Sequence, residues 1–179
     1  MFSSSGKDVH LTDTNAVANN ILHYLFSQCT VMVNGVPFTQ SHEHYDYRVY
    51  LETLLTYGTD AASSHLSNSY LYLHNGDMQP TDPTAELHTS ATNDGFIGRW
   101  SRLRGSMDFH LLGRLHTDVC DVLLFLQPRV LLLIKMTKDR PSFYLMKKIA
   151  DTKTTFKFLD AYLLVRRVQP NPEILKSQE

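Results

Sequence analysis

His42 and His44 are the residues whose types and spacing could most directly do chemistry, because a single residue separates two imidazoles. On a β-strand such a pair shares one face and could bind one metal ion. The pair instead falls between a predicted strand and a predicted helix, where the two-residue period does not hold, and Asp46 can cap that helix. We interpret the histidines as a polar lead-in to the helix and keep a metal site as the alternative.

A second candidate group comprises His110, His116 and Asp118. Alternating polar and apolar residues over 108–119 predict a half-buried strand, which would place all three on its polar face. They could then serve as metal ligands or as a general base, but we prefer the interpretation of a solvated sheet face. The sequence contains no nucleophile elbow, phosphate-binding loop, dinucleotide-binding glycine motif or zinc-binding His-Glu-x-x-His motif. We therefore predict no catalytic residue, no cofactor and no enzymatic activity.

The composition indicates one globular domain with much β-structure. The chain has 179 residues, of which 42% are hydrophobic, and its nine Tyr and nine Phe favour strands. A net charge of −1 gives no basic field for nucleic acid. The longest apolar stretch, 119–136, is interrupted at 127–129, so we read it as two strands and a turn rather than a membrane span. Cys29 and Cys120 lack paired zinc-site spacing and are predicted to be reduced core thiols.

Local patterns predict a hairpin followed by one helix. Apolar residues alternate from Cys29, and Asn34-Gly35 is a strong hairpin-turn signal. Residues 47–57 then change to a three- and four-residue period, and Gly58 follows where a helix commonly stops. The apolar stripe of this helix is expected to dock it against the sheet, and it consists of Tyr47, Tyr50, Leu51, Leu54 and Leu55.

The remaining segments complete an expected sandwich. Residues 1–19 are predicted to be a flexible polar arm, 59–106 a long loop and 173–179 a polar tail. Arg99, Arg102 and Arg104 are read as a solvated part of that loop. Further strands are expected over 130–137, 143–146 and 156–168. The predicted fold class is all-β and mostly antiparallel, a single jelly-roll-like β-sandwich over 20–172 with one short helix.

Four stretches carry a family resemblance. They are LFSQ with the later VNG and YDYRVYLETLLTYG (25–58), DFHLLGRLHTDVC (108–120), VLLLIKMTKDRPSFYLM (130–146) and FKFLDAYLLVRRVQPNP (156–172). Together they resemble the jelly-roll capsid proteins of Polinton (Maverick) elements and adintoviruses, major-capsid-like, over residues 20–172. The length holds one jelly roll where the double type needs two, so a fragment or a host-genome-resident copy is expected.

The resemblance implies a structural capsid subunit that self-associates, as a trimeric capsomer if it behaves like the family, or that binds other capsid proteins. No membrane and no specific nucleic acid is expected as a partner. The implied location is a virion, or otherwise the inside of a host cell. The alternatives are a cupin-like metal-binding enzyme and a ligand-binding β-sandwich. The cupin motif expects Glu four or five residues after its second His, where this chain has Arg48 and Val49, and Glu52 comes too late.

Overall fold

The computed structural model describes residues 2–3, 16–38, 44–75, 93–103, 108–122, 126–146 and 154–169. Its largest sheet is antiparallel and has the order β4 (Val36–Pro37), β3 (Phe26–Val33), β5 (Leu132–Lys138). Asn34 and Gly35 join β3 to β4 with φ angles of 51° and 81°. This left-handed backbone is what the Asn-Gly pair tolerates, so the predicted hairpin is confirmed.

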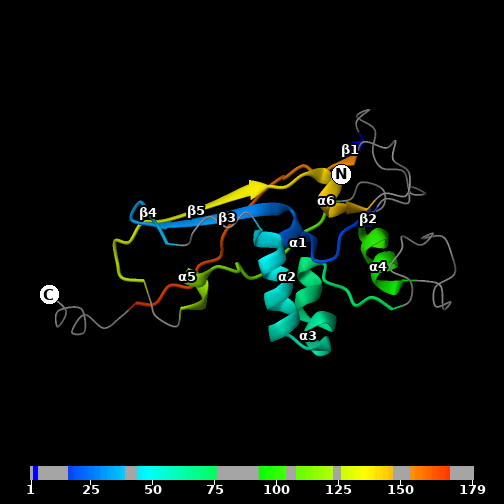
Figure 1. The fold of residues 1–179 in the computed structure, drawn as a ribbon, viewed down its shortest axis with the longest axis horizontal. Coiled ribbons are helices and arrows are strands. Elements are labelled where there is room, and N and C mark those ends of the chain that lie inside the picture. The colour runs from blue at the N-terminus through cyan, green and yellow to red at the C-terminus, as the bar shows by residue number, and fades with distance from the viewer. Residues whose placement is uncertain are drawn as a thin grey trace.

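Two small strand pairs and seven helical segments make up the other described elements (Figure 1). The strand pairs are β1 (Phe2–Ser3) with β7 (Thr154–Thr155), and β2 (Ala16–Val17) with β6 (Leu145–Met146). The helical segments are α1 (Ile21–Tyr24), α2 (Tyr45–Thr56), α3 (Thr59–Ser63), the 3-10 helix η1 (His65–Ser69), α4 (Asp94–Leu103), α5 (Asp118–Asp121) and α6 (Pro141–Tyr144).

The prediction of an all-β jelly-roll sandwich is wrong. The described residues form a mixed helix-and-strand structure whose sheets have two or three strands. Residues 108–117 carry no regular element, and the segment expected to be a strand over 143–146 begins as α6. Alternation identified segments able to form strands, but a strand also needs a neighbour to satisfy its backbone groups.

Helix α2 covers the inner face of the three-stranded sheet (Figure 1). Cys29 and Val31 of β3 pack there against Tyr45 and Val49 of α2, with the inward side chains of β5 alongside. Asp46, predicted to cap this helix, lies in its first turn, and His44 occupies the N-cap position. The helix was therefore predicted in the right place, but it starts two residues earlier than a cap at Asp46 implied.

The predicted docking stripe of α2 faces solvent instead of the sheet, so this prediction is wrong. Tyr47, Tyr50, Leu51, Leu54 and Leu55 are between 44% and 86% exposed. The buried side chains of α2 lie on its opposite face and are Tyr45, Asp46, Val49 and Thr53. This helix carries apolar residues on both faces, so its period alone could not identify the face that meets the sheet.

The described parts of the predicted arm and loop are structured. Ala16 and Val17, placed in the arm, are fully buried in β2. The predicted loop 59–106 contains α3, η1 and α4, and α4 contributes Phe96, Ile97 and Trp100 to a core cluster with Ala16. Residues 76–92 and 104–107 of that loop lie outside the described residues, as does the predicted tail 173–179.

Arg99 of α4 is fully buried, although it was predicted to be solvated. Its Nε donates to the backbone oxygen of Val17 over 2.9 Å, and its Nη1 has no hydrogen-bond partner among the described residues. Burial lowers the pKa of Arg99 to about 10. Arg102 is exposed and lies over the rings of Tyr70 and Tyr72, while Arg104 lies outside the described residues.

The end of the described chain, residues 156–169, has no helix or strand. Phe156 packs among Phe109 and Tyr144, and Phe158 stacks on Phe26 of β3 with ring centroids 5.9 Å apart. Beyond these contacts the segment is exposed, and the long strand predicted over 156–168 is not formed. Among the described helices, none is long and apolar enough to cross a membrane.

Candidate functional site

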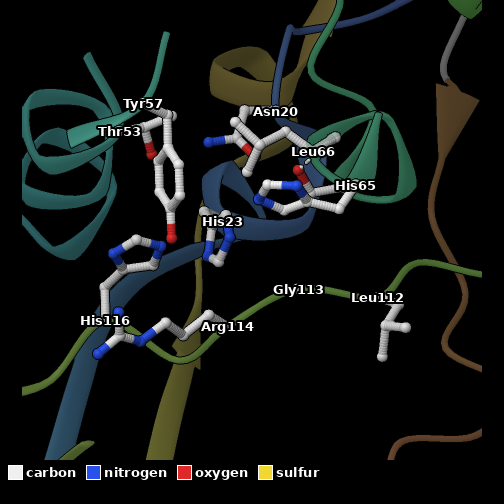
Figure 2. A pocket seen from close by; sticks show the side chains of 11 residues that line it. Asn20, His23, Thr53, Tyr57, His65, Leu66, Leu112, Gly113, Arg114 and His116 are labelled. Atoms are coloured by element: carbon white, nitrogen blue, oxygen red, sulfur yellow. Dashed lines mark hydrogen bonds between the residues drawn. The ribbon is translucent and has the colours of Figure 1, made fainter. Parts of the chain in front are cut away.

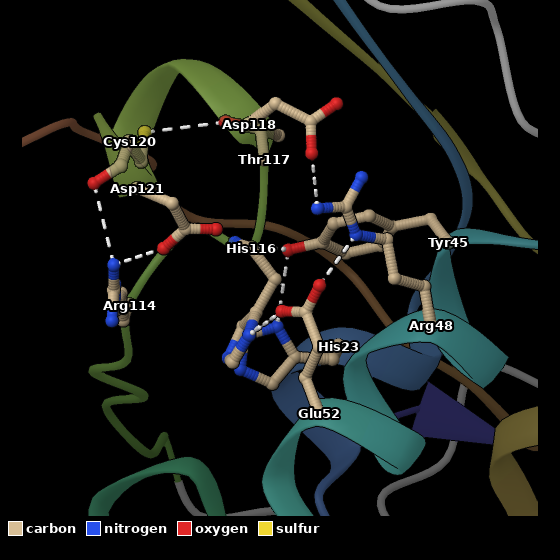
Figure 3. A network of polar contacts seen from close by, with 10 residues as sticks. All are labelled: His23, Tyr45, Arg48, Glu52, Arg114, His116, Thr117, Asp118, Cys120 and Asp121. Carbon is tan, nitrogen blue, oxygen red and sulfur yellow. Dashed lines mark hydrogen bonds and ion pairs between the residues drawn. The ribbon is translucent and has the colours of Figure 1, made fainter. Parts of the chain in front are cut away.

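A line of polar side chains joins α2 to the segment that leads into α5 (Figure 3). His116 Nδ1 lies 2.8 Å from one carboxylate oxygen of Glu52. The other oxygen accepts from Arg48 Nε over 2.6 Å, and Arg48 Nη2 donates to Asp118 over 2.6 Å. Arg48 and Glu52 are four residues apart on α2, which places them side by side on one helix face. The four groups thus form a continuous chain of charge-assisted bonds between two segments distant in sequence.

Tyr45 and His23 extend this network into the interior. The Tyr45 hydroxyl accepts from the backbone N–H of His116 over 3.4 Å and lies 3.3 Å from Nδ1 of His23. The imidazoles of His23 and His116 meet edge to face with centroids 5.0 Å apart. Helix α1 supplies His23 and α2 supplies Tyr45, so the network ties three segments together.

The protonation states follow from burial and contacts. Burial, reinforced by nearby His116, lowers the pKa of His23 to about 3, so its ring is neutral at neutral pH. Burial also raises the pKa of Tyr45, whose hydroxyl stays protonated. Burial works to raise the pKa of Glu52, but hydrogen bonds from Arg48 and His116 outweigh it and the net pKa is lowered. The hydrogen bond to Asp118 is the main cause of a raised pKa for Arg48.

A small cavity opens beside the two histidines (Figure 2). Its volume is about 50 Å³, and its lining includes His23, His116, Tyr57 and Ser69. Because one water needs about 10–15 Å³ of such cavity volume, the cavity accommodates a few waters, whereas pockets for organic ligands measure about 300–1,000 Å³. The Ser69 hydroxyl donates to the backbone oxygen of Leu66 over 2.8 Å. Gly113 forms part of the wall, and a Cβ added there would lie 3.2 Å from His23 Nε2.

A carboxylate that orients an imidazole is the arrangement expected of a general base. Here the carboxylate of Glu52 is shared with Arg48, and the cavity beside His116 is of water size. The geometry is that of a polar clamp, which fixes α2 against α1 and against the chain before α5. We refer to Arg48, Glu52, His116 and Asp118 with His23 and Tyr45 as the polar clamp.

The predicted chemical residues separate in the structure. His116 is buried in the polar clamp, Asp118 begins α5 and bonds Arg48, and His110 is exposed, so the predicted common strand face does not exist. His44 is exposed and contacts the ring of Tyr47, whereas His42 lies outside the described residues. Within the described ranges, no three His, Cys, Asp or Glu residues come together as a possible metal site.

Sequence reasoning missed the partners of His116. His23, Tyr45 and Glu52 are separated from it by 93, 71 and 64 residues, so no local spacing connects them. The only local signal was the four-residue separation of Arg48 and Glu52 on the predicted helix.

The two cysteines have different environments, and both are free thiols. Cys29 is buried as predicted, and burial raises its pKa to about 11. Cys120 is exposed, contrary to the prediction of a core thiol, and its sulfur accepts a hydrogen bond from Thr117 over 3.2 Å. The buried thiol of Cys29 is thus protonated at neutral pH.

Comparison with known proteins yields no relative: no protein-family model matches the chain, and no match was found among curated proteins or solved structures.

Proposed function

We propose that this chain is a structural, self-associating subunit of the capsid type that its sequence resembles, with no catalytic role. The observation that carries the proposal is the exposed apolar stripe of α2, defined as Tyr47, Tyr50, Leu51, Leu54 and Leu55. Leu55 is 86% exposed and Leu54 is 59% exposed. Contiguous apolar surface of this kind is typical of protein–protein interfaces.

The polar clamp supports a structural role for the stripe. Arg48 and Glu52 lie on the same helix as the stripe and bond side chains outside it, Asp118 and His116. These bonds, together with the buried Val49, hold α2 in one orientation and so present the stripe outward as a fixed surface. A rigid apolar helix face loses little conformational entropy on binding, which favours association.

The partner we propose is a second copy of the chain. Full burial of one large apolar side chain contributes about 1.5–3 kcal/mol, so even partial cover of the stripe offsets much of the cost of association. A net charge of −1 leaves little long-range repulsion between copies. A capsid subunit needs surfaces of this kind that contact its neighbours, and it needs no reactive pocket.

Sedimentation velocity of the purified chain, from low micromolar to near-millimolar concentration, tests the proposal. We expect the weight-average sedimentation coefficient to rise with concentration. Leu55→Lys should weaken association by roughly tenfold, the effect of losing one apolar contact. Thr56→Lys adds the same charge at the adjacent exposed position and serves as the matched control.

A folded wild-type protein that stays monomeric throughout this range would contradict the proposed function. If both lysine variants weaken association equally, the proposal that the chain self-associates stands, but the contact lies on a surface other than the stripe. Circular dichroism of each variant establishes that the fold is retained.

A further inference from the structure

Strand β5 presents a free backbone edge. β3 pairs with β4 on one side and with β5 on the other, so β5 is an outer strand. Asn34 and Leu131 form a hydrogen-bonded pair, which fixes the alternation along β5. Leu132, Ile134, Met136 and Lys138 therefore direct their N–H and C=O groups away from β3. Among the described residues, no backbone group bonds to this edge.

The C-terminal segment has the composition of a strand that lacks a sheet. Tyr162, Leu163, Leu164 and Val165 are consecutive large apolar residues, and they are 74%, 54%, 73% and 64% exposed. Alternate residues of a strand point to opposite faces, so this run is apolar on both. Runs of this type are expected in strands covered on both sides. None of residues 157–169 forms a backbone–backbone hydrogen bond with another described residue.

We propose that residues 159–168 of one copy add as a strand to the free edge of β5 in a second copy. This inference rests on the proposed function, and it names a second surface, besides the stripe of α2, through which two copies join. The donated backbone would satisfy the outward groups of β5, and its two apolar faces would extend the two faces of the sheet. Each chain carries one donor segment and one acceptor edge, so two copies can exchange segments reciprocally.

The start of the segment is anchored to its own chain. Phe156 and Phe158 are held by ring contacts with Tyr144 and Phe26. The backbone oxygen of Phe156 also accepts from Lys138 Nζ at the end of β5 over 3.0 Å, and the chain then passes the sheet towards α5 (orange to red in Figure 1). Among the described residues, none beyond Phe158 bonds its backbone to β5 of the same chain. The anchored residues fix where the donor segment begins, and its exposed remainder is available to a second copy.

The apolar surface available is sufficient for a stable dimer. Six large apolar side chains over 159–168 are between 54% and 74% exposed. With roughly 60 Å² of apolar surface lost for each, one donor segment would bury about 360 Å². Two segments and their two acceptor surfaces together give about 1,400 Å², which lies within the range of standard protein–protein interfaces.

Two complementary blocked variants test the exchange. Met136→Pro removes an N–H that points away from β3, so it blocks the acceptor edge while keeping the bonds to β3. Met136→Ala, the matched control, shortens the same side chain and keeps that N–H. Leu163→Pro/Leu164→Pro blocks the donor in any register, because adjacent N–H groups point to opposite sides, and Leu163→Val/Leu164→Val is its control.

Sedimentation velocity would be measured on each variant and on an equimolar mixture of the two proline variants, with circular dichroism to establish folding. We expect each proline variant alone to associate at least tenfold more weakly than wild type, and both controls to associate as wild type does. The mixture should associate more strongly than either proline variant but less strongly than wild type, since one variant supplies the donor, the other supplies the acceptor, and only one of the two exchanges can form.

Four results would overturn the inference, and the last of them would overturn the proposed function as well. Proline variants that associate as the wild type does would place the contact elsewhere, and the proposed function would stand. Folded variants whose mixture associates no more strongly than either variant alone would exclude a donor and an acceptor on separate surfaces. In a Cys29→Ala/Cys120→Ser background, which removes the thiol that pairs with position 136 on β3, a disulfide between Met136→Cys and Leu164→Cys that forms within one chain instead of between two would show that the segment closes its own edge. A monomeric wild type would overturn both proposals.

Discussion

The neutral, buried imidazole of His23 makes folding stability depend on pH. Its pKa is about 3 in the folded chain and near 6.5 when exposed. Between these values the unfolded chain binds one more proton than the folded chain, so stability is lost as the pH falls from 6.5 towards 3. At about pH 5, which is about 1.5 pH units below the pKa of the exposed imidazole, the free energy of unfolding is lower by about 2 kcal/mol.

His23→Phe removes this titration and retains the shape of the ring. At about pH 7.5 the variant should be less stable than wild type by about 1 kcal/mol, because the hydrogen bond with Tyr45 is lost. At about pH 5 the wild type has lost about 2 kcal/mol through His23, so the variant should be the more stable by about 1 kcal/mol. The two stability curves are expected to cross between these pH values.

Urea unfolding followed by circular dichroism at both pH values measures the effect. His110→Gln is the control, because it removes an exposed imidazole and leaves His23 in place. The reasoning is refuted if wild type and His23→Phe lose the same free energy of unfolding between the two pH values. That result would mean that the imidazole titrates in the folded chain as it does in water.

Three further predictions concern packing and reactivity. Gly98→Ala should stabilise α4 by about 0.5–1 kcal/mol through helix propensity. Gly95→Ala should instead destabilise the protein by about 1–3 kcal/mol, because the added Cβ would lie 2.6 Å from the backbone oxygen of Leu73. Thermal unfolding compares the two variants, and equal effects on stability would contradict the close approach at Gly95. Arg99→Met should be at least as stable as wild type, because it removes a buried charge without a carboxylate partner among the described residues, while Arg99→Ala should lose about 2–4 kcal/mol by leaving a cavity. A Met variant that is less stable in urea unfolding would show that the hydrogen bond to the Val17 oxygen outweighs the cost of burying the charge. A thiol reagent at neutral pH should modify Cys120 in the folded chain and Cys29 only after unfolding, and equal rates measured by mass spectrometry would show that Cys29 is accessible.

The features that could be predicted from the sequence are those set by neighbouring residues. Asn34-Gly35 specifies its own turn, and the strand from Cys29 to Val33 needs only the alternation that the sequence displays. The period over 47–57 identified α2 for the same reason. Its orientation depends on Val49 and Tyr45 meeting the sheet, which is a contact between distant segments and has no local signal.

Helix α4 shows why the polar region 59–106 was misread. Two glycines and two arginines within ten residues resemble a solvated loop. The apolar residues Phe96, Ile97 and Trp100 recur at helical spacing, and Asn93 caps them by accepting from the Phe96 N–H over 3.0 Å. Average composition hid this pattern, and burial of Arg99 could not be anticipated because its acceptor lies 82 residues away.

The segments 108–119 and 156–168 have strand patterns but no strand in the structure. A pattern with apolar residues on both faces indicates a need for neighbours without identifying them. Within the described chain, the edge of β5 has no partner either. The unpaired segment and the unpaired edge are complementary in backbone chemistry and in apolar character. Because every chain contains both the edge and the segment, a second copy is the simplest molecule able to pair with the two of them. Its binding would allow residues within 156–168 to form the strand that their sequence pattern predicts.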